Sequence, residues 1–228
     1  MSSNIIAHCI VRSNTVILDG KIIYQESNNA ENLETFLTNV YRHWGISYPK
    51  FFKMDILSKL AFITAEKMLE NRSFCGSDMA LVLSNNSSSI MSDIHHQKSI
   101  QKPESYFPSP AVFVYTLVNI MLGELCIRHK ITGENTVFIH EKFEKDLQIN
   151  YSNYLIDSNL CKICINGRID VSPHGYEAFF YLTQQEYALD FNIHKLVHTP
   201  DNIEKLHHQK IQKFKEKNVV ESDGMALV

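Results

Sequence analysis

The fold is decided by the stretch from Ser109 to Val171, SPAVFVYTLVNIMLGELCIRHKITGENTVFIHEKFEKDLQINYSNYLIDSNLCKICINGRIDV. Ser109 is a helix N-cap candidate, and Pro110 suits the first helical turn, where a missing N–H is tolerated. The segment Ala111–Ile127 is apolar almost all round, which predicts a buried helix. A strand, an elbow, a second helix and a second strand are predicted to follow, at Thr136–Ile139, Lys142, Phe143–Leu155 and Ile163–Asp170.

Motifs in this stretch resemble the N-terminal half of the β-ketoacyl synthases, the condensing enzymes of the thiolase-like fold. The matching residues are Ser109, Pro110 and Phe113, then Asn119 and Gly123, then Gly133, Asn135 and Thr136, and finally Ile163–Asp170. Upstream, Phe51–Leu69 is similar to the Met-Asp helix of the family and Met79–Ser84 to its next core strand. The match needs no gaps from Val114 to Val171, and the resemblance reaches about Phe191.

The resemblance implies an α/β fold: a thiolase-like N-terminal half with a layered mixed sheet flanked by helices. Residues 1–175 are expected to form the synthase-like domain. Residues 176–228 are expected to be a C-terminal extension of strands and a charged helix, a short vestige of the second half packed on the same domain.

The reactive cysteine of the family has no counterpart here. In active members the strand after the glycine turn delivers this cysteine at a tight elbow; the ungapped match puts Lys142 there, between Glu141 and Phe143. No cysteine occurs between Cys126 and Cys161. The species that accepts the acyl chain is a thiolate, and a solvated lysine ammonium is not a nucleophile. The two histidines that the family supplies from its second half are also missing, so we expect no condensation chemistry.

The helix after the elbow is predicted to be amphipathic. Its apolar stripe would consist of Phe143, Leu147, Tyr151, Tyr154 and Leu155. Charged and amide side chains populate the remaining surface, and burying unpaired ions costs several kcal/mol each. One face of this helix is therefore expected to meet water.

The family resemblance implies the role of a chain-length factor, the inactive partner of a ketosynthase, similar to the truncated partners in bacterial aryl-polyene and flexirubin-type pigment synthesis. The expected partner is a β-ketoacyl-ACP synthase in a heterodimer, with acyl carrier protein involved indirectly. The strand before the elbow is expected to pair antiparallel with the partner's strand, through Asn135, Thr136, Val137, Phe138, Ile139 and His140. Candidate residues for the wall of an acyl tunnel are Phe113, Tyr115, Phe138 and Phe143, each of which could equally be core packing.

Two alternatives remain open. The cluster His140-Glu141-Lys142 could be a residual decarboxylase or acyl-transfer site built on Lys142. The chain could also be a self-associating scaffold without a synthase partner.

Composition narrows the class of protein. The 228 residues are 44% hydrophobic, enough for a core, and the net charge of −3 without a basic stripe argues against nucleic-acid binding. Ala111–Ile127 is too short and too interrupted for a membrane span. The first 14 residues lack the signal-peptide pattern, and five cysteines without framework spacing suit a reducing cytoplasm. No cofactor motif occurs.

The rest of the chain predicts ordinary elements. Ile5–Tyr24 reads as two or three strands with an Asp19-Gly20 turn, and Glu31–Trp44 and Ile56–Leu69 as helices, the second capped by Asp55. Ser84–Pro108 reads as an irregular polar loop, and Asp201–Lys217 as a charged helix. Neither His8 with Cys9 nor His95 with His96 is spaced for a metal, and strand alternation is expected to separate the sulfurs of Cys161 and Cys164 onto opposite faces. No metal site is expected.

Overall fold

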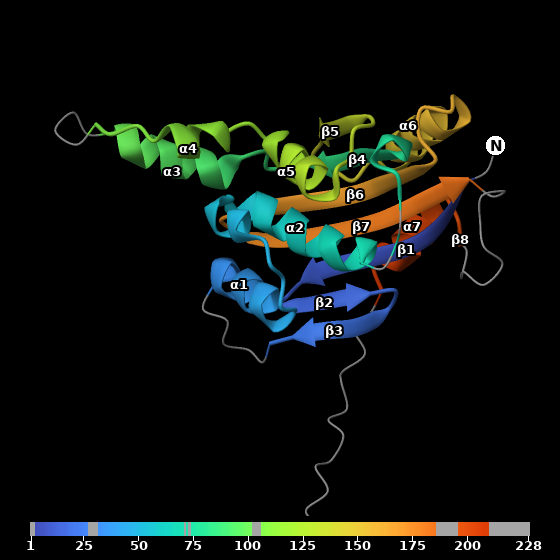
Figure 1. The fold of residues 1–228 in the computed structure, drawn as a ribbon, viewed down its shortest axis with the longest axis horizontal. Coiled ribbons are helices and arrows are strands. Elements are labelled where there is room, and N and C mark those ends of the chain that lie inside the picture. The colour runs from blue at the N-terminus through green and yellow to red at the C-terminus, as the bar shows by residue number, and fades with distance from the viewer. Residues whose placement is uncertain are drawn as a thin grey trace, which may run out of the picture.

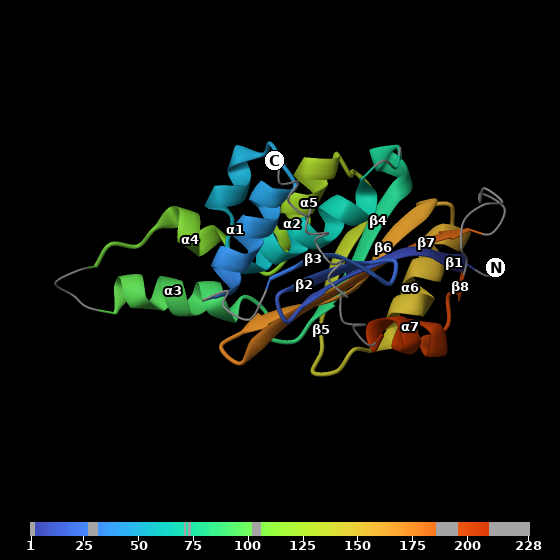
Figure 2. The ribbon, with the colours of Figure 1, turned by 90° about the horizontal axis from the view of Figure 1, so that it is seen from below.

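One mixed β-sheet forms the centre of the molecule and carries helices on both faces (Figures 1 and 2). The computed structural model describes residues 3–26, 32–70, 72, 74–101, 106–185 and 196–209. Helices α1, α2 and α5 lie on one face of the sheet, and α6 and α7 lie on the other (Figure 2).

The strand order is β3-β2-β1-β7-β6-β4-β5, and the short β8 pairs with β1. The strand bounds are β1 Ser3–Arg12, β2 Thr15–Leu18, β3 Lys21–Gln25, β4 Met79–Asn85, β5 Asn135–Ile139, β6 Ile163–Ser172, β7 Gly175–Gln185 and β8 Leu196–Val197. β4 runs parallel to β5 and to β6, whereas β7 is antiparallel to both β6 and β1. Among the described strands, β5 is therefore the edge next to the elbow.

The helices cover the two faces unequally. Their bounds are α1 Leu33–His43, α2 Ile56–Leu69, α3 Ile90–Ile100, α4 Pro110–Val114, α5 Ile120–His129, α6 Lys145–Asp157 and α7 Pro200–His207, with 3₁₀ turns at Pro49–Lys53 and Gly76–Asp78. The largest buried cluster lies between the sheet and α1, α2 and α5. Two smaller clusters lie on the opposite face, one shared with α7 and one under α6.

The described residues from β1 to the end of α2 fold as their pattern predicts. The Asp19-Gly20 turn joins β2 and β3, with positive φ at both residues. The stripe of α1 is buried, and the Asp55 side chain caps α2 by accepting a hydrogen bond of 2.9 Å from the Ser58 N–H. The fully buried face of α2 makes this helix the main cover of the sheet.

The single buried helix expected at Ala111–Ile127 is wrong. The chain forms α4, a non-helical turn around Tyr115–Asn119, and α5. The break allows the Tyr115 hydroxyl to donate a 2.9 Å hydrogen bond to the carboxylate of Glu124, which is 5% exposed. The Ser109 cap is present, but much of α4 faces solvent rather than the core.

The irregular loop expected at Ser84–Pro108 is also wrong, because it contains α3. β4 runs on to Asn85, and the serine-rich segment makes a tight turn with positive φ at Ser88. The carboxylate of Asp170 accepts hydrogen bonds from the Asn86 and Ser87 N–H groups and fixes this turn to β6. The polar run is therefore a strand-to-helix connection.

The segment after residue 175 completes the sheet. β7 begins at Gly175 and pairs with β6 from Gly175 to Gln184 and with β1 from Ala178 to Gln185. α7 ends at His207, short of the predicted Lys217, and the part of the helix prediction beyond Gln209 falls outside the described residues.

Candidate functional site

The elbow lies at the carboxyl end of β5, in the loop from His140 to Glu144 that leads into α6. The His140 N–H donates to the carbonyl of Asn85 at the end of β4, at 2.9 Å. The Arg168 guanidinium donates to the carbonyl of Glu141 at 3.3 Å. Lys142 is exposed, and among the described residues its ammonium has no hydrogen-bond or ion-pair partner. An amine used as a nucleophile is normally desolvated, and Lys142 is not.

Phe143 turns in the opposite direction and anchors the elbow. Its ring contacts Phe179 of β7 with centroids 6.3 Å apart and His207 of α7 at 5.8 Å, both edge to face. Two residues further on, Lys145 pairs with Glu204 of α7. α7 therefore holds the elbow against the sheet.

Gln148 fixes α6 to the sheet, and sequence reasoning missed it. This side chain is 1% exposed; its Nε2 donates to the Gly167 carbonyl at 2.6 Å, and its Oε1 accepts from the Gly167 N–H at 3.0 Å. A Cβ at Gly167, where φ is +148°, would lie 2.0 Å from the Phe179 carbonyl oxygen. The available signal was the spacing of Gln148 and Ser152, two polar residues four apart that lie on the same face of the helix and are both buried.

The apolar stripe predicted for α6 is right only in part: Leu155 is buried and Phe143 and Tyr151 are partly buried against the core, but Tyr154 is exposed. The buried residues are Gln148, Ile149, Ser152, Leu155 and Ile156, whereas Tyr154 is 59% exposed. The amide–backbone pairing at Gly167 rotates the helix about its axis relative to the hydrophobic pattern. The expected solvent-facing side is present, because Glu144, Asp146 and Asn150 are exposed.

The edge of β5 offers free backbone groups. The Glu134 carbonyl accepts from the Leu81 N–H, and the His140 N–H donates to Asn85, so the even-numbered residues point their backbone groups at β4. Alternate residues of a strand point them the other way. Asn135, Val137 and Ile139 therefore direct their N–H and C=O groups away from the sheet.

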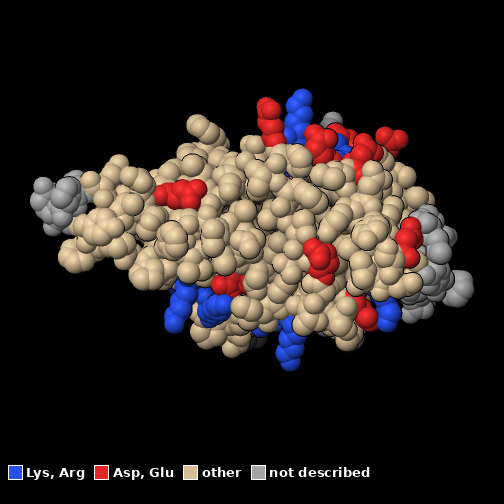
Figure 3. All heavy atoms as spheres, turned by 90° about the horizontal axis from the view of Figure 1, so that it is seen from above, with Lys and Arg blue, Asp and Glu red and all other residues tan. Residues whose placement is uncertain are grey.

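The surface around this edge is apolar and carries few charges. Figure 1 places α3, α4, α5, β5 and α6 along one side of the molecule, and Figure 3 looks onto that side. Lys and Arg lie only along its margins (Figure 3). The large hydrophobic side chains exposed on these elements and on the turn between α4 and α5 are Phe113, Val114, Leu117, Ile127, Ile139 and Tyr154.

Solved structures with the same fold were found, although no protein-family model and no curated protein matches the chain. The ishigamide ketosynthase/chain length factor aligns with a TM-score of 0.61 at 14% identity, over 83% of this chain and 64% of that one. A type II polyketide ketosynthase in complex with its acyl-carrier protein, AntDE:AntF, aligns at 0.58 and 11%, over 84% and 65%. Ketosynthase twelve of the bacillaene synthase from Bacillus amyloliquefaciens aligns at 0.54 and 11%, over 85% and 45%.

The chain has the ketosynthase/chain length factor fold. The mixed sheet flanked by helices that the resemblance implied is confirmed. The chain spans less than two thirds of the length of the first ketosynthase/chain length factor structure and less than half of the bacillaene ketosynthase.

The four candidate tunnel residues of this ketosynthase-fold chain do not meet within it. Phe113 contacts the His96 ring, and Tyr115 contacts Glu124. Phe138 packs edge to face on Tyr151 of α6 with centroids 5.6 Å apart, while Phe143 belongs to the separate cluster with α7. Phe138 and Phe143 lie near the elbow, and the other two lie on or beside α4.

The pair Cys161 and Cys164 is buried in one apolar cluster under α6, so the expected separation onto opposite faces is wrong. β6 begins only at Ile163, and Cys161 in the preceding loop is free to turn to the same side. Burial raises the pKa of the Cys161 thiol to about 11 and the pKa of the Cys164 thiol well above its ordinary value. Neither is a thiolate at neutral pH.

A second buried polar cluster links β1, β7 and β8. His198 Nδ1 lies 3.0 Å from Ser3 Oγ, and His198 Nε2 lies 3.3 Å from the Tyr181 hydroxyl. Burial lowers the pKa of His198 to about 4. Among the described residues, no group of three or more His, Cys, Asp or Glu is placed to hold a metal ion, and no helix is long and apolar enough to cross a membrane.

Proposed function

We propose that the chain is a non-catalytic, chain-length-factor-like subunit that pairs with an active β-ketoacyl-ACP synthase. In this role it completes the partner's structure and helps to shape the tunnel that holds the growing acyl or aryl-polyene chain. Acyl carrier protein would meet the complex through the synthase. The observation that carries the proposal is the combination of a ketosynthase fold with an elbow that presents Lys142 to solvent.

The chemistry of the elbow supports a non-catalytic role. Acyl transfer to a condensing enzyme needs a thiolate, and the elbow contains none. Lys142 stands in water, and within the described part of the chain no hydrogen bond or ion pair joins its ammonium to a base.

The open edge of β5 supports pairing with another subunit. Natural proteins protect exposed edge strands with charges, prolines or bulges. Asn135–Ile139 contains no charged residue and no proline, and its pairing with β4 has no bulge. Such an edge matches β-strand addition, in which main-chain hydrogen bonds provide affinity.

The candidate tunnel residues would line an acyl tunnel only in a complex with the synthase. Phe113 is 56% exposed and Phe138 is half-buried beside the β5 edge, so a subunit docked on β5 would cover both. Bulky rings at these positions would then limit the length of the bound chain.

Co-expression with a β-ketoacyl-ACP synthase from the same source tests the proposal. We expect the two chains to co-purify as a stable complex, and polyketide or polyene synthesis by the synthase to require both. Recovery of the chain alone as a folded homodimer, with no synthase bound and no effect on synthesis, would contradict the proposal and favour a self-associating scaffold.

A further inference from the structure

A cavity of about 570 Å³ opens where α1, α2 and α3 begin, beside the turn that joins β6 to β7. These segments meet at the end of the sheet from which α3 projects (Figures 1 and 2). The turn follows β6, which is parallel to β4, so the cavity lies outside the carboxyl ends of parallel strands. Open α/β sheets bind their ligands at that edge, and ligand pockets typically measure about 300–1,000 Å³.

The walls of the cavity are apolar and incompletely covered. Leu33, Ile56, Met91 and Tyr176 line it and are only partly buried, although they pack against the main buried cluster. The Tyr176 hydroxyl donates to Asn14 Oδ1 at 2.7 Å and accepts from the Asn14 N–H at 2.8 Å, so its ring is the part available to a ligand. An apolar molecule in the cavity would remove these side chains from water, which is favourable.

The charges at the cavity are already compensated. Glu34, in the lining, forms an ion pair with Lys59. The positive end of α1 is capped by Asn32, whose side chain accepts from the Thr35 N–H at 2.9 Å, and that of α2 is capped by the carboxylate of Asp55. None of the described residues that line the cavity is Lys or Arg. An anion would therefore find no cation to pair with, and the lining favours an uncharged ligand.

We propose that this cavity binds one small, uncharged apolar molecule. The polar groups that could orient it are Asn32 Nδ2 and the His174 ring, which have no hydrogen-bond partner among the described residues and can donate to a carbonyl or hydroxyl oxygen. Met91 is a flexible side chain that adapts to an irregular ligand. The site includes neither β5 nor the elbow, so it does not depend on pairing with a synthase.

The probe for the test is diphenylhexatriene, an uncharged conjugated hydrocarbon that fluoresces in apolar surroundings. We expect the purified chain to bind one equivalent of this probe saturably. The propionate derivative of the same fluorophore should bind more weakly, because its carboxylate meets Glu34 and no Lys or Arg. Tighter binding of the propionate would contradict the uncharged class of ligand.

Two matched variants locate the probe. Met91→Glu puts a carboxylate in the wall and should weaken binding at least about tenfold. His95→Glu adds the same charge at an exposed position of the same helix outside the lining, and should bind within about twofold of wild type. An acidic residue is favourable in the first turn of a helix, so Met91→Glu should keep the thermal unfolding midpoint. Leu33→Glu, in the first turn of α1, repeats the test from another helix.

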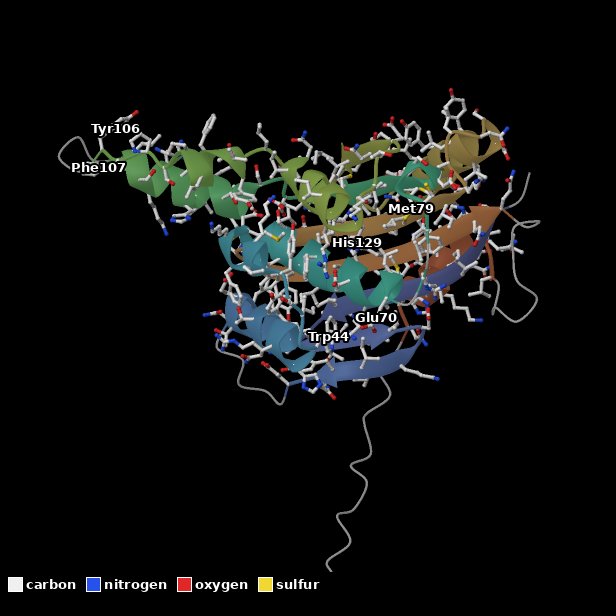
Figure 4. The ribbon with its side chains drawn as sticks, in the orientation of Figure 1. Trp44, Glu70, Met79, Tyr106, Phe107 and His129 are labelled. Atoms are coloured by element: carbon white, nitrogen blue, oxygen red, sulfur yellow. The ribbon has the colours of Figure 1, made fainter. Side chains whose placement is uncertain are left out.

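An exposed aromatic residue elsewhere is the competing site for an apolar probe. Phe107 is 79% exposed at the far end of α3 from the cavity and points away from the body of the protein (Figure 4). Phe107→Ser should bind the probe as the wild type does. If Phe107→Ser loses the probe, if Met91→Glu and Leu33→Glu both keep it, or if the wild type shows no saturable binding, the proposed site is wrong. Each of these results leaves the proposed pairing through β5 untouched.

Discussion

Replacing Gln148 with alanine removes the residue that docks α6 on the sheet. The side chain is almost fully buried and pairs with both backbone groups of Gly167 in β6. The Gly167 carbonyl keeps a weaker contact with Ser84 Oγ at 3.4 Å, but the Gly167 N–H is left without a partner.

The expected loss follows from these contacts. Two hydrogen bonds contribute about 1 kcal/mol each, and a buried unpaired N–H costs roughly 1–3 kcal/mol. The free energy of unfolding should therefore fall by about 3–5 kcal/mol, a large part of the roughly 5–15 kcal/mol that holds a typical domain together.

Urea unfolding followed by circular dichroism measures the loss. Asn150→Ala is the control, because Asn150 lies on the same helix and is exposed; its effect should stay within about 0.5 kcal/mol. If Gln148→Ala also stays within that range, the amide–backbone pairing does not hold α6, and the explanation for the position of the elbow is wrong.

Three further outcomes are expected. The purified chain should not decarboxylate malonyl-carrier protein above background; activity that disappears in Lys142→Ala would restore the enzymatic alternative. Because burial lowers the pKa of His198 to about 4, the unfolded chain takes up the proton first as the pH falls; this contribution to stability is complete above about pH 6.5 and is lost toward pH 4, by about 3 kcal/mol. His198→Gln should flatten that part of the pH profile, and an unchanged slope would refute the assignment. Iodoacetamide should label exposed Cys75, whose pKa is lowered by its hydrogen bond with Ser77, long before buried Cys161 and Cys164; equal labelling of all three in the folded chain would contradict the buried placement.

Local chemistry made much of the fold predictable. The Asp55 cap, the Asp19-Gly20 turn and the strand at Thr136–Ile139 each depend on residues close in sequence, and each occurs where the pattern puts it. The motifs around Ser109–Val171 then indicated the mixed sheet flanked by helices, the fold that the chain shares with the solved ketosynthase structures.

Two of the failures involve polar side-chain contacts that a hydrophobic pattern does not encode. The helix predicted at Ala111–Ile127 is interrupted at Tyr115–Asn119, where Tyr115 bonds to buried Glu124, and α6 turns Gln148 toward the backbone of Gly167. Neither partner can be identified from spacing along the chain. The apolar residues of α4 were predicted to be core because hydrophobicity alone does not distinguish a side chain buried within the chain from one exposed on its surface.

The most direct test of the central claim is the affinity of Val137→Pro for a β-ketoacyl-ACP synthase. Val137 points its N–H away from β4, and proline is tolerated on an edge strand where the missing N–H faces outward. Val137→Thr, which keeps the N–H and the branched shape, is the control. We expect Val137→Thr to bind as the wild type does, and Val137→Pro to remain folded but lose the synthase. Equal binding by folded Val137→Pro would contradict pairing through β5.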